Sequence, residues 1–135
     1  MRPKNLQGPT VLVVDDFDDM RTALRLWLEK WGYRVVEAGD GEKALQVARE
    51  ERPGVILMDI GMPRRSGISA AYKIKKDPEL QRIPIVAITA YETADLHDAA
   101  MEAGCVGCLC KPVDSLELQA LLRKLLGASE LSRSH

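Results

Sequence analysis

Short apolar runs alternate with stretches of helical periodicity along the whole chain. Three of the runs consist almost entirely of Val, Ile and Leu, which is typical of parallel strands covered by helices on both faces. Two other short runs also have the composition of strands. The five predicted strands span residues 11–14, 33–37, 55–58, 83–89 and 106–110.

Between these runs, apolar residues recur at steps of three and four, the spacing of one helix face. The first such stretch ends at Gly32, because glycine readily adopts the conformation that terminates helices. Asp40 is placed to cap the second helix, and Asp114 with Glu117 has the spacing of a capping box. The expected helices span about residues 20–31, 40–52, 66–76, 93–103 and 114–125.

Five strand–helix units in succession predict an α/β fold, a doubly wound five-stranded parallel sheet with right-handed crossovers. The 135 residues correspond to one domain, since domains average about 150 residues. We expect an N-terminal extension at residues 1–9, the domain at 10–126 and a short polar tail at 127–135.

Composition and charge exclude several classes of partner. The formal net charge is −1, so the basic excess of a nucleic-acid or anionic-membrane binder is missing. No apolar run approaches the roughly twenty residues of a membrane-spanning helix, and no secretion signal is evident at residues 1–10. The three cysteines are an odd number crowded into residues 105–110, which favours a reducing, cytoplasmic location.

Polar residues stand where four of the predicted strands end. They are Asp15 and Asp16 after the first strand, Asp59 after the third, Thr89 in the fourth and Lys111 after the fifth. Ligand sites of open α/β sheets lie at the carboxyl ends of the strands, so we expect these side chains at one edge. Neighbouring side chains of a strand point to opposite faces, so Asp15 and Asp16 converge only if the strand breaks into a loop there.

These residue types have the chemistry needed for phosphoryl transfer to a carboxylate. Three carboxylates repel each other unless a cation binds, and oxygen ligands without a nearby His or Cys favour Mg²⁺ or Mn²⁺ over zinc. Lys111 would add a fixed positive charge and Thr89 a hydroxyl that donates to an anion. These groups would neutralise the oxygens of a phosphoryl group while a carboxylate attacks it in line.

Each of these residues also has an ordinary structural interpretation. An Asp at a strand end is most often a turn residue or a helix cap, a Thr in a strand is often only a strand former, and a Lys is often a solvated charge. Their combination at the ends of successive strands favours the functional interpretation.

Four segments together resemble the receiver domain of two-component response regulators. The resemblance covers essentially residues 9–126 and implies a flavodoxin-like fold with strand order 2-1-3-4-5. The matching segments are VLVVDDFDDMR at 11–21, VILMDIGMPRRSG at 55–67, IPIVAITA at 83–90 and CLCKPVD at 108–114.

This resemblance assigns roles to the residues at the strand ends. Asp59 would be the phosphoacceptor, and Asp16 and Asp59 would bind a divalent ion, Mg²⁺ or Mn²⁺, directly. Asp15 would act partly through water, and the carbonyl of Gly61 would complete the protein ligands.

The resemblance also covers the residues that would face the phosphoryl group. Thr89 and Lys111 would hold its oxygens, and a cis peptide bond is implied between Lys111 and Pro112.

The implied function is that of a switch rather than of a turnover enzyme. A sensor histidine kinase or a histidine phosphotransfer protein would donate a phosphoryl group to Asp59. The surface made by the fourth helix, fifth strand and fifth helix would then act on an unknown downstream protein.

Two alternatives belong to other classes. One is a phosphohydrolase with an aspartyl-phosphate intermediate, which is disfavoured because Gly61 stands where such enzymes carry a second Asp. The other is an interaction module of the same fold that takes up no phosphate.

The sequence departs from the family pattern at Cys108, where receivers usually carry Tyr or Phe three positions before the lysine. That aromatic ring takes part in the usual readout of phosphorylation, so the readout is in doubt. Tyr91 is a candidate for a substitute ring, although a surface tyrosine without such a role is the simpler interpretation.

The spacing C-x-x-C-x-C at Cys105, Cys108 and Cys110 superficially suggests a metal site. A tetrahedral site needs a fourth ligand, and His97 lies a helix away. Small buried hydrophobic residues are the better interpretation, since cysteine thiols are among the most buried side chains.

Overall fold

A computed structural model describes residues 8–90 and 94–127, in which five strands alternate with five helices. The strands are β1 (Thr10–Val14), β2 (Arg34–Ala38), β3 (Val55–Asp59), β4 (Ile85–Thr89) and β5 (Gly107–Cys110). The helices are α1 (Asp18–Lys30), α2 (Gly41–Glu51), α3 (Ser66–Lys76), α4 (Ala94–Glu102) and α5 (Ser115–Leu122), with a 3₁₀ turn η2 (Pro63–Arg65) before α3 and a π-helical segment η3 (Arg123–Gly127) after α5. None of these helices is long and apolar enough to cross a membrane.

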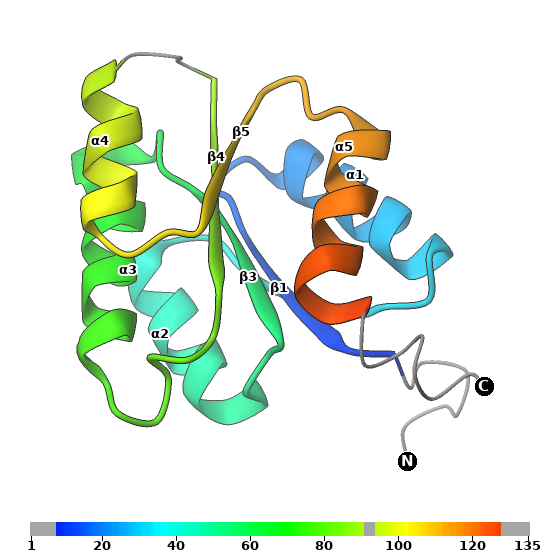
Figure 1. The fold of residues 1–135 in the computed structure, drawn as a ribbon, viewed down its shortest axis with the longest axis horizontal. Coiled ribbons are helices and arrows are strands. Elements are labelled where there is room, and N and C mark those ends of the chain that lie inside the picture. The colour runs from blue at the N-terminus through cyan, green and yellow to red at the C-terminus, as the bar shows by residue number, and fades with distance from the viewer. Residues whose placement is uncertain (1–7, 91–93, 128–135) are drawn as a thin grey trace.

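The five strands form one parallel sheet in the order β2-β1-β3-β4-β5. This order confirms the predicted doubly wound fold. The helices cover both faces, with α2, α3 and α4 on one side and α1 and α5 on the other (Figure 1). The switch in direction of winding falls between β1 and β3, and ligand sites of such sheets lie beside that point.

Alternate residues of the central strands supply the two hydrophobic cores, because successive strand side chains point to opposite faces. Leu12 and Val14 of β1 pack with α2, α3 and α4, whereas Val11 and Val13 pack with α1 and α5. β3 and β4 alternate in the same way, and their buried residues are almost all aliphatic. This double burial explains why these strands read as unbroken apolar runs.

Two predicted helix caps are present. The Asp40 side chain accepts a hydrogen bond from the Lys43 backbone N–H at 2.8 Å. The Asp114 side chain accepts from the backbone N–H groups of Leu116 and Glu117 at 2.8 and 3.1 Å. Each cap satisfies donors that the first turn of a helix leaves without a partner.

The end of α1 shows why the second strand begins one residue later than predicted. Gly32 has a φ of 97°, and the backbone N–H of Tyr33 donates to the Leu28 carbonyl at 3.0 Å. This bond belongs to a Schellman turn, which commits Tyr33 to the helix end. β2 therefore starts at Arg34, and the predicted start at residue 33 is wrong.

Other predicted boundaries are also wrong, among them the start of the fifth strand, which lies at Gly107 rather than at residue 106. The fourth strand starts at Ile85 rather than at Ile83, since the Ile83 N–H donates to the Leu80 carbonyl in a turn and Pro84 has no N–H to give to the sheet. The last α-helix ends at Leu122, and the chain continues as the π-helical segment η3 instead of an α-helix to residue 125.

Candidate functional site

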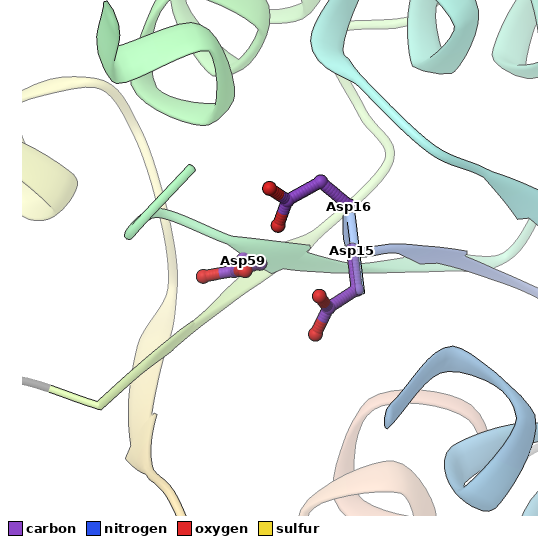
Figure 2. A group of neighbouring side chains, drawn as sticks. All are labelled: Asp15, Asp16 and Asp59. Atoms are coloured by element: carbon purple, nitrogen blue, oxygen red, sulfur yellow. The ribbon is translucent and has the colours of Figure 1, made fainter. Parts of the chain in front are cut away.

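The carboxylates of Asp15, Asp16 and Asp59 lie together at the carboxyl edge of the sheet (Figure 2). β1 and β3 are neighbouring parallel strands, and one oxygen of each residue lies within 4.8 Å of the others. Asp15 and Asp59 are 1% and 5% exposed, whereas Asp16 is open to solvent. The adjacent aspartates reach one place because β1 ends at Val14 and the chain then turns toward α1.

Hydrogen bonds hold both the backbone N–H and the two carboxylate oxygens of Asp15. Its N–H donates to the Ala38 carbonyl at the end of β2 at 3.1 Å. One carboxylate oxygen accepts the Phe17 N–H at 2.9 Å, and the other lies 3.2 Å from the Lys111 ammonium nitrogen. Both oxygens therefore have a protein donor although the side chain is buried.

Asp59 ends β3 and has two donors of its own. The Gly61 backbone N–H donates to Oδ1 at 2.8 Å, and the Nζ atom of Lys111 lies 3.4 Å from Oδ2. Burial raises the pKa of Asp59 and the negative charge of Asp15 adds to that effect, which together outweigh the Gly61 hydrogen bond and the Lys111 charge. The ionised form of Asp59 is thus poorly compensated by the protein alone.

Lys111 follows β5 and is the cation shared by the two buried aspartates. Burial acts to lower the pKa of Lys111, but the charges and hydrogen bonds of Asp59 and Asp15 outweigh it, so the pKa is raised. The Lys111 N–H donates to the Thr89 carbonyl at 2.8 Å, which fixes where the side chain leaves the sheet. The Lys111–Pro112 peptide bond is cis, as the resemblance implied.

Thr89 is the last residue of β4 and is 2% exposed. β4 pairs with β3 in a register that places Ile88 opposite Asp59, so Thr89 stands one position farther toward the carboxyl edge. Tyr91, the candidate substitute ring, lies outside the described residues together with Glu92 and Thr93.

The turn after Asp59 is shaped by a close approach of two backbones. A Cβ atom on Gly67, at the start of α3, would lie 2.3 Å from the Asp59 carbonyl oxygen. Only glycine fits there without displacing either segment. Beside the turn, a cavity of about 390 Å³ opens next to Asp16, lined by residues that include Asp40, Met62 and Arg64.

The cysteines do not form a metal site with one another. Within residues 8–90 and 94–127, Asp15, Asp16 and Asp59 are the one group of three or more candidate ligands close enough to hold an ion. Cys105 is buried in the core on the α2–α4 side, and burial raises its pKa to about 11. Cys108 is partly buried and packs against the same core, which agrees with the interpretation of these side chains as small hydrophobic residues.

Arg21 is a residue of the site region that the sequence analysis missed. Its guanidinium donates to the Asp15 carbonyl at 2.7 Å and pairs with Asp18 and Glu37 at 2.6 and 3.1 Å. Burial acts to lower the pKa of Arg21, but the hydrogen bonds that it donates to Asp18 and Glu37, together with their negative charges, outweigh burial and raise the pKa. The sequence did contain a signal for the pair with Asp18, because an Asp three residues before an Arg lies on the same face of a helix. The contact with Asp15 depends on the tertiary structure.

Residues 11–123 match the family described as the response regulator receiver domain. The chain belongs to this family. The receiver is a domain of two-component response regulators, and in this chain Asp15, Asp16, Asp59, Thr89 and Lys111 stand at the carboxyl edge of its sheet.

Known proteins with similar sequences and structures agree with this assignment. The chain is 32% identical over 118 residues to the polar-differentiation response regulator DivK of Brucella anthropi, covering 87% of this chain and 96% of DivK. The receiver domain of a Pseudomonas aeruginosa sensor histidine kinase, with a magnesium ion coordinated in the active site cleft, has a TM-score of 0.82 at 33% identity, with 89% of this chain and 98% of that chain covered. The Vibrio cholerae chemotaxis protein CheY4 has a TM-score of 0.82 at 28% identity, with 88% and 99% covered.

Proposed function

We propose that this receiver is a phosphoacceptor switch that takes a phosphoryl group onto Asp59 in a reaction that requires a divalent cation. The observation that carries the proposal is the gathering of three carboxylates, two of which are buried and paired with the same lysine. Three negative charges and one positive charge leave the edge of the sheet with an excess of about two negative charges. An incoming phosphate would be repelled from such a site unless a cation joined it.

The donor set fits Mg²⁺ or Mn²⁺. Carboxylate and carbonyl oxygens are the ligands that these hard ions prefer, and one oxygen each from Asp15, Asp16 and Asp59 lies within the span of a single ion. We infer that these three residues hold the ion, Asp15 partly through water, with the Gly61 carbonyl as a further ligand. When bound, the ion supplies positive charge that neutralises the oxygens of the transferred group.

In the proposed reaction, a carboxylate oxygen of Asp59 forms a bond to phosphorus while the bond from phosphorus to the donor's imidazole nitrogen breaks. The donor histidine leaves as neutral imidazole, because its other ring nitrogen takes up a proton from water before the bond to phosphorus breaks. Lys111, which lies 3.4 Å from Asp59 Oδ2, would hold one phosphoryl oxygen, and the Thr89 hydroxyl would hold another. The Gly61 N–H fixes Oδ1 and orients the carboxylate.

We infer that Asp59 is a reactant rather than a turnover catalyst. Gly61 occupies the position where aspartyl-phosphate phosphohydrolases place an acid–base Asp, which argues against steady hydrolysis of small phosphate esters. The proposed donor is a sensor histidine kinase or a histidine phosphotransfer protein. We further propose that the receiver unit spans residues 10–126 and that its signal leaves through protein–protein contacts. A cytoplasmic location stays a prediction.

Incubation with acetyl phosphate and Mg²⁺, read by intact mass, tests the proposal. Wild-type protein should gain the mass of one phosphoryl group, and the gain should vanish with EDTA or in Asp59→Asn. Asp98→Asn, which removes an exposed carboxylate on α4, is the matched control and should be labelled normally. Normal labelling of Asp59→Asn would show that the acceptor is another residue.

A further inference from the structure

The Arg21 guanidinium joins three elements at the edge of the sheet. Nη1 donates to the Asp15 carbonyl at 2.7 Å, Nη2 pairs with Asp18 at the start of α1 at 2.6 Å, and Nε pairs with Glu37 of β2 at 3.1 Å. The side chain is only 20% exposed. A planar group with three nitrogens engaged in three directions has little freedom to move.

The acceptor that follows β1 is significant, because the Asp15 carbonyl belongs to the peptide that links Asp15 to Asp16. A peptide unit is planar, so its orientation sets ψ of Asp15 and φ of Asp16. Those two angles decide the relative directions of the two side chains. In a continuing strand they would point to opposite faces, whereas here both carboxylates reach within 4.8 Å of Asp59.

Arg25 provides a natural comparison one helical turn farther along α1. It also pairs with Glu37, through the other carboxylate oxygen at 3.2 Å, and with Glu29 at 3.3 Å. Glu37 therefore has two arginine partners, and removal of either one leaves the other in place. No contact joins Arg25 to Asp15 or Asp16 among the interactions of the described residues.

We propose that Arg21 is a positioning residue for the cation site, and that it acts by fixing the peptide between Asp15 and Asp16. This inference rests on the proposed function, because it assumes that the two aspartates hold a divalent ion. Arg21 touches neither the ion nor the phosphoryl group in this scheme. Its loss should weaken Mg²⁺ binding and leave the phosphoryl transfer itself unimpaired once the ion is bound.

The test compares Arg21→Gln with Arg25→Gln by Mg²⁺ titration, using calorimetry and the amide shifts of Asp16 and Gly61. Each variant removes one positive charge and one partner of Glu37. Loss of a residue that orients metal ligands typically weakens affinity by about 10- to 100-fold, so Arg21→Gln should show a loss in this range. Arg25→Gln should bind Mg²⁺ as the wild type does.

Two further measurements separate positioning from charge and from general damage to the fold. Arg21→Lys keeps the charge but not the three-way contact, so it should also bind Mg²⁺ more weakly than Arg25→Lys; this pair decides the question if Arg21→Gln does not fold. The rate of labelling by acetyl phosphate should recover to near the wild-type rate when Arg21→Gln is saturated with Mg²⁺.

The possible results distinguish an error in the proposed function from an error in the role of Arg21. If wild-type protein neither binds Mg²⁺ nor takes up phosphate, the proposed function is wrong. If wild-type protein does both, but the Arg21 and Arg25 variants bind Mg²⁺ equally well, only the role of Arg21 is wrong. Wild-type affinity in Arg21→Lys would likewise overturn positioning in favour of a plain effect of charge.

Discussion

Asp59 is buried beside a second carboxylate, and its raised pKa has a consequence for stability. The folded state binds a proton at Asp59 more tightly than the unfolded state does. Stability therefore falls as the pH rises above the ordinary pKa of an aspartate and through the raised folded value, and the full destabilisation is present only above that folded value. Neutralisation of this side chain should thus stabilise the protein.

The corresponding prediction concerns Asp59→Asn in the absence of divalent ions. At pH 7 this variant should unfold at a higher urea concentration than the wild type, and the difference should shrink as the pH falls and wild-type Asp59 takes up its proton. Addition of Mg²⁺ should also reduce the difference, since the ion stabilises only the wild-type carboxylate cluster. Equal urea midpoints at pH 7 in EDTA would mean that Lys111 already compensates the charge of Asp59.

The role of Lys111 can also be tested by a substitution that should leave the protein folded. Lys111 stands after β5 at the carboxyl edge of the sheet, and its ammonium lies 3.2 and 3.4 Å from the two buried aspartates. Lys111→Ala should therefore fold but be labelled by acetyl phosphate more slowly, or lack the change in amide shifts that labelling produces.

The control for this substitution is Lys76→Ala, which removes an exposed lysine at the end of α3. Circular dichroism and intact mass suffice for the comparison. If Lys111→Ala is labelled at the wild-type rate and shows the wild-type change in amide shifts, Lys111 is only a solvated surface charge.

At the scale of elements, β5 and α4 raise the question of how phosphorylation is read out. Cys108 packs against the core on the α2–α4 side of the sheet, as Leu96 and Ala99 of α4 also do, and it stands where receivers usually carry an aromatic ring. A buried aromatic side chain removes about 150–250 Å² from water, and a cysteine buries far less. The coupling between the phosphoryl site and the α4–β5 surface should therefore be weaker here or carried by other residues.

We predict that beryllofluoride, a phosphoryl mimic, perturbs the amide shifts of residues 89–93 and α4 more than those of β5. Cys108→Tyr should strengthen the response of β5 if the space beneath residue 108 accepts the ring. Couplings of this kind are typically about 1–3 kcal/mol, so one ring makes a measurable difference. Large amide shift changes centred on Cys108 in the wild-type protein would contradict the prediction that β5 responds less than residues 89–93 and α4.

At the scale of the molecule, the proposed cation site exists only in the folded state. Its proposed ligands stand at the ends of β1 and β3. Asp16 and Asp59 are 43 residues apart in the sequence and are brought together by the sheet. A ligand that binds only the native state stabilises it by about 2.7 kcal/mol when present at 100 times its dissociation constant. The binding of Mg²⁺ and global unfolding are therefore linked.

For a domain of this size, such stabilisation should raise the thermal midpoint by roughly 10 °C. Differential scanning calorimetry with Mg²⁺, against NaCl of equal ionic strength, measures the shift. Asp16→Asn should lose most of it, because Asp16 is exposed and its substitution removes a ligand without disturbing either core. A shift of equal size in Asp16→Asn would place the ion elsewhere on the protein.

The sequence by itself determined the number, order and type of the elements. Double burial makes β1, β3 and β4 almost wholly aliphatic, and the capping residues Asp40 and Asp114 are local signals that need no tertiary contact. The placement of polar residues at strand ends also indicated which side chains to examine, since parallel strands bring their carboxyl ends to one edge.

Only the tertiary structure decided where strands begin and how the site is held. Tyr33 belongs to a helix end because of a bond to Leu28, and Ile83 lies in a turn closed by Leu80, which apolar character alone cannot reveal. Lys111 pairs with Asp15 and Asp59, which are distant from it in the sequence. Arg21 contacts a backbone atom, the carbonyl oxygen of Asp15. Such contacts depend on distances between elements, and those distances are set by packing rather than by any local pattern of residues.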